Sequence, residues 1–194
     1  MASAPPVLLV VDLQQGIVEG AADWGPRSTP RLTENVANLL SSWRSRQWPI
    51  LHVYHDALDE PDNPAQVKFP ETFAPHPSAA PLASEPQFIK HQGSGFIGTR
   101  LQEELERLQK DRKRQVVVIG MDGSQCINNT VRHGADLGFD LLVVADACAC
   151  YGMEDWRTGK QLGAEETWEA AIGVLTSCAK VVETEKLFGI LGYN

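Results

Sequence analysis

Residues 116–145 read VVVIGMDGSQCINNTVRHGADLGFDLLVVA, and this stretch decides the fold. It begins with the apolar run 116–119 and closes with a second apolar run, 141–145. Between them, the pattern over 126–137 predicts a helix that stops at Gly138. Continuous apolar runs of this length are typical of strands buried on both faces of a parallel sheet. The stretch therefore predicts a strand, a short turn, a helix and a second strand.

The same alternation of strands and helices extends outward in both directions. Residues 56–86 are rich in proline and lack periodicity, so a long loop is expected there. The order of elements predicts a three-layer α/β/α sandwich around a six-stranded, mainly parallel, Rossmann-like sheet, with 1–194 as a single domain. The remaining predicted strands are 7–11, 50–55, 88–90 and 181–182, and the remaining helices are 31–47, 99–110 and 164–178.

Composition narrows the class of protein. The net charge is −8, which argues against a nucleic-acid or anionic membrane surface. Four cysteines among 194 residues are too few for a disulfide scaffold, and no apolar run is long enough for a membrane span. The start, MASAPPVLLVVDLQQ, lacks the basic segment of a signal peptide. We expect a cytoplasmic protein with free thiols.

Chemistry-bearing residues follow several predicted strands. Asp12 ends the first, His55 the second and Lys90 the third, and Cys126 comes after the turn behind the fourth. Ligands of open parallel sheets bind beyond the carboxyl ends of the strands, so these side chains are expected to converge. Cys126 also begins a predicted helix, where the dipole and free N–H groups stabilise a thiolate or an oxyanion.

Two other motifs carry less weight. Residues 93–98, GSGFIG, match the G-x-G-x-x-G of dinucleotide sites, but the strand before them is short and carries Lys90. His52 and His55 lie three positions apart on one strand and therefore on opposite faces, which disfavours a shared metal. His133 lies two helical turns beyond Cys126, too far away to be its base.

Four segments together resemble the isochorismatase-like cysteine hydrolases, a superfamily that includes nicotinamidases and N-carbamoylsarcosine amidohydrolase. They are VVDLQQG around Asp12, HVYHDA at 52–57, FIKHQGSGFIGTRLQEEL around Lys90, and the stretch around Cys126 already quoted. The resemblance extends over about 7–187. It identifies the glycine-rich segment as part of the family's pattern rather than a nucleotide loop.

The resemblance implies a catalytic triad of Asp12, Lys90 and Cys126. It also implies a cis peptide bond between Met121 and Asp122, which would aim the N–H groups of Asp122 and Cys126 at one oxyanion. Asp12 would accept the thiol proton, and Lys90 would hold the thiolate.

The sequence also departs from the family. Many relatives have threonine where this chain has Gly123, and Asp122 occupies a position that is usually small and apolar. The metal-binding D-x-H…H pattern of nicotinamidases is missing from 55–58, HDAL, so no metal and no cofactor are expected.

The presence of Cys126 favours hydrolysis of a C–N bond in a small amide, ureido or lactam-type substrate. Two alternatives remain open: an isochorismatase-type vinyl-ether hydrolase that does not need Cys126, and a catalytically silent scaffold. The resemblance implies a homo-oligomer, a dimer or tetramer, and segments 56–86 and 153–163 are expected to frame the pocket or a subunit contact. The candidate substrate contacts are Gln14, Trp24, His55 and Phe96.

Overall fold

The computed structural model describes residues 4–110 and 113–193 and contains a six-stranded sheet in the order β3-β2-β1-β4-β5-β8. All five strand pairings are parallel. The predicted α/β fold is confirmed. The strands are β1 (Val7–Val11), β2 (Ile50–His55), β3 (Gln87–Lys90), β4 (Gln115–Gly120), β5 (Asp140–Cys148) and β8 (Lys180–Val182).

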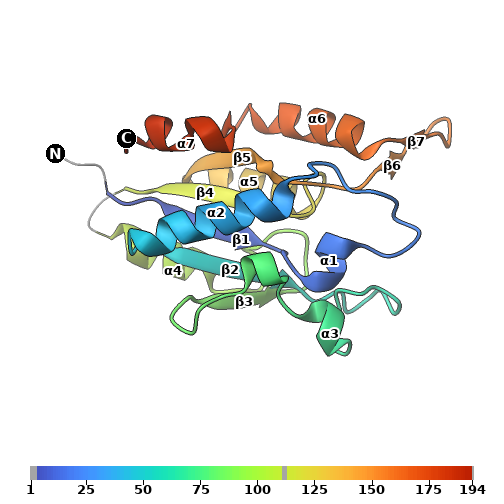
Figure 1. Cartoon of the computed structure of the whole chain (residues 1–194), viewed down its shortest axis with the longest axis horizontal. Coiled ribbons are helices and arrows are strands. Elements are labelled where there is room, and N and C mark those ends of the chain that lie inside the picture. Colours follow the sequence, from blue (N-terminus) through green and yellow to red (C-terminus); the bar gives the residue numbers. More distant parts are fainter. Residues whose placement is uncertain (1–3, 111–112, 194) are drawn as a thin grey trace.

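Helices cover both faces of the sheet. Helices α2 (Leu32–Ser45) and α7 (Thr184–Leu191) pack on one face, and α2 crosses in front of the strands in Figure 1. Helices α4 (Leu101–Gln109), α5 (Cys126–Asp136) and α6 (Ala164–Leu175) pack on the other face.

Strand β1 shows why the sheet needs two apolar layers. Side chains alternate between faces along a strand. Leu8 and Val10 accordingly join the core under α2 and α7, whereas Leu9 and Val11 join the core under α4, α5 and α6. Every residue of β1 is apolar and fully buried, and the first polar side chain comes where the chain leaves the sheet at Asp12.

Helix α7 was not predicted from the sequence. Its first turn is held by a distant residue, because Asp146 Oδ1 accepts hydrogen bonds from the backbone N–H and the hydroxyl of Thr184, both at 2.8 Å. The Asn35 side chain also donates to the Asp146 backbone carbonyl at 2.6 Å. Asp146, the acid near the end of the fifth predicted strand, thus caps a helix.

Short elements occupy the regions that connect the strands. Helix α1 (Gln15–Glu19) follows β1, and the predicted loop holds only α3 (Pro70–Phe73) and the 3-10 turn η1 (Pro77–Ala79). A small antiparallel hairpin of β6 (Met153–Glu154) and β7 (Gln161–Leu162) precedes α6. Within the described ranges, no helix is both long and apolar enough to cross a membrane.

Candidate active site

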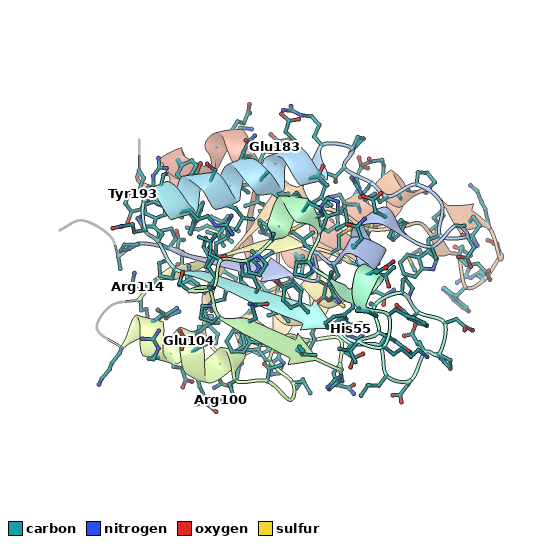
Figure 2. All side chains as sticks on the ribbon, turned by 60° about the horizontal axis from the view of Figure 1, so that its bottom comes forward. His55, Arg100, Glu104, Arg114, Glu183 and Tyr193 are labelled. Carbon is teal, nitrogen blue, oxygen red and sulfur yellow. The ribbon has the colours of Figure 1, made fainter. Side chains whose placement is uncertain are left out.

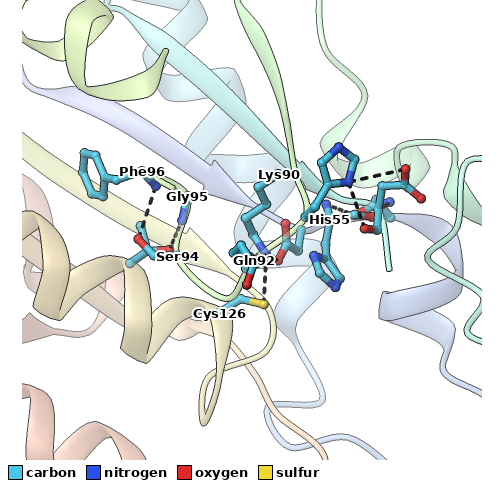
Figure 3. A network of polar contacts seen from close by, with 12 residues as sticks. His55, Lys90, Gln92, Ser94, Gly95, Phe96 and Cys126 are labelled. Carbon is cyan, nitrogen blue, oxygen red and sulfur yellow. Dashed lines mark hydrogen bonds and ion pairs between the residues drawn. The ribbon is translucent and has the colours of Figure 1, made fainter. Parts of the chain in front are cut away.

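The carboxyl edge of the sheet brings together Asp12, Lys90 and Cys126. Figure 2 shows this edge where β2 ends at His55. The Lys90 Nζ lies 2.8 Å from Asp12 Oδ2 and 3.1 Å from Cys126 Sγ, and it also donates to the Gln92 carbonyl at 3.1 Å (Figure 3). Asp12 and Lys90 are fully buried, while Cys126 is half-buried. One ammonium group therefore bridges a carboxylate and a thiol.

Asp12 adopts a backbone conformation that is uncommon for a residue with a side chain. Its φ is 52°, in the left-handed region, and its N–H donates to the Val53 carbonyl at 2.8 Å. Strain of this kind persists where the surrounding structure over-determines it, and it clusters at functional sites.

The turn from β4 to α5 places Cys126 at the start of its helix. The peptide bond between Met121 and Asp122 is cis. Gly120 has φ 137°, and a Cβ there would collide with the Val11 carbonyl. Glycine is therefore required where the Cys126 turn passes the end of β1.

The Asp122 side chain holds the turn in shape. Its Oδ1 accepts hydrogen bonds from the Ser124 N–H at 2.8 Å and the Ser124 hydroxyl at 2.7 Å, and its Oδ2 accepts one from the Tyr151 N–H at 3.1 Å. Gly123 has no room for a side chain, because a Cβ there would overlap the Trp168 ring. The two departures from the family pattern are thus explained by local packing and hydrogen bonding.

Most backbone donors of the turn are used within the protein. The N–H groups of Gly123 and Gln125 donate to the carbonyls of Ala149 and Asp122. Among the residues that the structure describes, the N–H groups of Asp122 and Cys126 have no acceptor. Two donors in the same turn are therefore free for a ligand.

The charges around Cys126 oppose one another. Burial, followed by the negative charge of Asp12, raises the pKa of the Cys126 thiol to about 12, although Lys90 lowers it. Burial alone would lower the pKa of Lys90, but the charges of Asp12 and Cys126 outweigh it and raise that pKa. The start of a helix and a nearby lysine were expected to favour the thiolate, whereas the net effect in the unliganded site favours the protonated thiol.

A cavity of about 480 Å³ opens beside the sulfur and is lined by both Asp12 and Cys126. The rings of Trp24 and Tyr151 also line it and meet edge to face, with centroids 5.2 Å apart. The volume falls within the usual range of small-molecule sites.

Two of the four expected substrate contacts line this cavity. Trp24 and His55 do so, and both are half-buried. Burial and then the charge of Lys90 lower the pKa of His55, so its ring is neutral at pH 7. Within the described ranges, His55 Nδ1 is buried and has no hydrogen-bond partner.

Gln14 does not line the cavity, which corrects the expectation drawn from its place near Asp12. Its side chain is fully buried. The amide donates to the carbonyls of His55 and Phe73 at 3.0 and 3.2 Å and accepts from the His55 N–H at 2.8 Å. Gln14 thus fixes the backbone at the end of β2, and its hydrogen-bonding groups are occupied.

Phe96 does not line the cavity either. Figure 3 shows its ring on the far side of the Lys90 loop, away from the Cys126 sulfur. It packs beneath α5 against His133 and Phe139, with ring centroids 5.4 and 5.7 Å away. Phe96 is a core residue that anchors the glycine-rich segment.

The sequence missed several residues of the cavity wall. Tyr151 follows β5 and lines the cavity, but no motif marks it. Both segments that were expected to frame the pocket do contribute: Glu60 comes from the long loop and Glu154 from the hairpin. Within the described ranges, no group of three or more His, Cys, Asp and Glu side chains is arranged to hold a metal ion.

Comparisons with known proteins agree on one family. A family model described as Isochorismatase domain matches residues 6–186. The isochorismatase family protein YddQ of Bacillus subtilis is 32% identical over 189 residues, covering 93% of this chain and 97% of that protein. A solved structure of an isochorismatase-family protein from Chromobacterium violaceum has a TM-score of 0.87 at 30% identity, covering 99% of this chain and 96% of that one. A cysteine hydrolase from Pseudomonas syringae shares the fold alone, with a TM-score of 0.79 at 18% identity, covering 97% of this chain and 92% of that one.

Proposed function

Because this chain belongs to the isochorismatase family of hydrolases, we propose that it hydrolyses a C–N bond through a thioester on Cys126. The substrate is a small amide, ureido or lactam-type compound. The observation that carries the proposal is the Lys90 ammonium, which contacts both a carboxylate and the thiol. A vinyl-ether hydrolase with no use for Cys126 has no need for this arrangement.

The reaction begins with transfer of the thiol proton. Asp12 Oδ2 contacts Lys90, whereas Oδ1 has no hydrogen-bond partner in the described part of the chain and is the acceptor we assign. Because the pKa of the thiol is raised, we assign its deprotonation by Asp12 to the step in which the sulfur attacks. Lys90 stabilises the negative charge on whichever group carries it. General base catalysis of this kind contributes about 10²–10⁴ in rate.

Attack by Sγ on the substrate carbonyl forms a C–S bond and places negative charge on the carbonyl oxygen. The free N–H groups of Asp122 and Cys126 are the donors for this oxyanion. One such donor is worth about 10²–10³ in kcat. The C–N bond then breaks, and the proton held by Asp12 passes to the leaving nitrogen.

The thioester is released by water. Asp12 is ionised again and takes a proton from a water molecule, while the water oxygen attacks the thioester carbon. The C–S bond breaks, the carboxylic acid leaves, and Asp12 returns the proton that it took from the water to the sulfur. The cycle consumes one water, needs no redox partner, and returns all three residues to their resting states.

The vinyl-ether alternative is less compatible with the cavity. An ether whose hydrolysis releases pyruvate carries a carboxylate next to the bond that breaks. In the part of the chain that the structure describes, the residues lining the cavity include no Lys and no Arg. A carboxylate in the cavity would therefore lack a cationic partner other than the Lys90 group already shared by Asp12 and Cys126.

The test is ammonia release from a panel of small amides and ureido compounds, with rapid acid quenching and intact-mass analysis. We expect turnover in the wild type and in Cys178→Ala, loss of turnover in Cys126→Ala, and an acyl adduct on Cys126. Cys178 is a suitable control because it is a half-buried free thiol in the turn between α6 and β8, outside the cavity. Pyruvate release from an enol ether that survives Cys126→Ala would overturn the proposal, as would inactivity across the whole panel.

A further inference from the structure

The cavity beside Cys126 is lined by acids without a compensating base. Within the described ranges, no Lys or Arg lines it, and the neutral His55 supplies no positive charge. Five of the lining residues are carboxylic acids: Asp12, Asp23, Glu60, Asp122 and Glu154.

The two inner acids already have partners. Asp12 is paired with Lys90, and the Asp122 carboxylate accepts hydrogen bonds from Ser124 and Tyr151. Lys90 itself is fully buried against Asp12 and Cys126, so it offers no charge to the outer part of a ligand. The unbalanced negative charge therefore belongs to the outer acids.

The three outer acids, Asp23, Glu60 and Glu154, come from three separate segments. Asp23 follows α1, Glu60 lies in the long loop after β2, and Glu154 ends β6. No described residue forms an ion pair with any of them. Three like charges around one opening raise the local concentration of cations and repel anions.

An aromatic wall lies in the same cavity as these acids. The faces of Trp and Tyr rings attract cations, and Trp24 and Tyr151 both line the space. The hydroxyl of Tyr151 is engaged with the carbonyls of Ile17 and Val18 at 3.0 and 3.3 Å, which fixes the ring. A fixed aromatic wall beside carboxylates suits an organic cation better than a hydrated metal ion.

Two unsatisfied polar atoms point independently to a ligand in this cavity. The fully buried Asp12 Oδ1 and the buried Nδ1 of His55 have no hydrogen-bond partner among described residues, and both residues line the cavity. A buried carboxylate oxygen without a partner is costly, so a ligand whose N–H group reaches Asp12 Oδ1 offsets that cost on binding. His55 Nδ1 donates or accepts according to its tautomer.

We propose that the substrate carries an organic cation, an ammonium or guanidinium group, at the end remote from the bond that is cleaved. The cation lies between the Trp24–Tyr151 wall and the outer acids, while the carbonyl lies at Cys126. The placement of the carbonyl rests on the proposed function. The preference for positive charge does not, because it follows from the cavity alone.

The first test measures access to Cys126 without a substrate. Three alkylating reagents are compared at pH 9: (2-iodoacetamidoethyl)trimethylammonium, neutral iodoacetamide and anionic iodoacetate. Peptide mass spectrometry gives each rate at Cys126 relative to Cys178 in the same sample. We expect the cationic reagent to be favoured over iodoacetate at Cys126 by about 10-fold at low salt, and the ratio to fall as salt rises.

Two matched triple variants separate local from overall charge. The first variant removes the three outer acids: Asp23→Asn, Glu60→Gln and Glu154→Gln. At Cys126 it should bring the ratio of the cationic to the anionic alkylation rate close to one. The control removes three exposed acids elsewhere and should leave the ratio unchanged: Glu71→Gln, Glu106→Gln and Glu169→Gln. Equal relative rates for iodoacetate and the cationic reagent in the wild type would overturn the proposal.

The second test uses three amides of matched length: 5-aminopentanamide, 5-hydroxypentanamide and glutaramate. We expect the highest kcat/KM for the ammonium compound, and a loss of that advantage in the outer-acid variant. Ammonia release with glutaramate preferred would refute cation recognition and leave amide hydrolysis standing. A cation preference in alkylation without ammonia release from any of the three would refute hydrolysis of such amides and leave cation binding standing.

Discussion

Replacing Asp12 with asparagine should make Cys126 more reactive towards a simple alkylating reagent while abolishing hydrolysis. Asp12 and Cys126 both contact the Lys90 Nζ, at 2.8 and 3.1 Å. After burial, the Asp12 charge is the largest contribution that raises the pKa of the thiol, and Lys90 opposes it. Asp12→Asn keeps the shape of the side chain and leaves the ammonium group unopposed beside the sulfur.

The size of the effect follows from the geometry. Because burial and the Asp12 charge raise the pKa of the thiol, only a small minority of Cys126 is a thiolate at pH 8. Removing a like charge within about 6 Å lowers a pKa by 1–3 units, so the thiolate fraction should rise about 100-fold. A less basic thiolate is intrinsically less nucleophilic, which reduces the net gain in alkylation rate to about 10-fold. Hydrolysis should fall by about 10²–10⁴, because the base is gone.

The assay is the rate of iodoacetamide modification at Cys126 between pH 6 and 10, determined by peptide mass spectrometry beside ammonia release. Asp23→Asn is the matched control. It removes one charge from the same cavity, but Asp23 is not among the main causes of the raised pKa of the thiol, so alkylation should change less than about twofold. Circular dichroism verifies that Asp12→Asn is folded. If the folded variant is alkylated no faster than the wild type, the assigned roles of Asp12 and Lys90 are wrong.

Three further predictions concern packing and buried charge. Gly123→Ala forces a methyl group against the Trp168 ring and should lower the free energy of unfolding by about 1–3 kcal/mol in urea titrations; an unchanged value would contradict the packing argument. Glu85→Ala should lower it by about 3–5 kcal/mol, because Arg44 and His52 both bond to this buried carboxylate, and a loss under 1 kcal/mol would count against it. Burial lowers the pKa of His52, so below pH 6.5 the unfolded chain takes up a proton that the folded chain does not. The free energy of unfolding should therefore fall by up to about 1.4 kcal/mol for each pH unit below 6.5. His52→Gln should flatten that slope in urea titrations at several pH values.

The sheet could be predicted well because each strand is marked by a pattern of neighbouring residues in the sequence. Each central strand contains a continuous apolar run. Asp12 directly follows β1, Lys90 ends β3, and Cys126 begins the helix that follows β4. Parallel pairing then brings the carboxyl ends together, so adjacency in space follows from topology without knowledge of side-chain packing. This reasoning placed Asp12, Lys90 and Cys126 correctly at one edge.

Features that depend on distant contacts could not be predicted. The first turn of helix α7 is hydrogen-bonded to Asp146, which lies on β5. Gln14 was misassigned because proximity to Asp12 along the chain says nothing about its bonds to His55 and Phe73.

The raised pKa of the thiol was missed for a similar reason. The start of a helix and a nearby lysine both favour a thiolate, and both are visible in the sequence. Burial of the sulfur, which acts in the opposite direction and is the largest cause, depends on the complete fold.

Lys90 ends β3, a four-residue strand at the edge of the sheet that, within the described residues, pairs with β2 alone. Asp12, in contrast, follows β1, which is flanked on both sides. Fraying of a marginal strand requires far less free energy than global unfolding. Fraying of β3 would carry the ammonium group away from Asp12 and Cys126 while the rest of the sheet persists. Amide hydrogen exchange along β3 should be faster than along β1, and in mild denaturant hydrolysis should disappear before the far-ultraviolet signal of the fold.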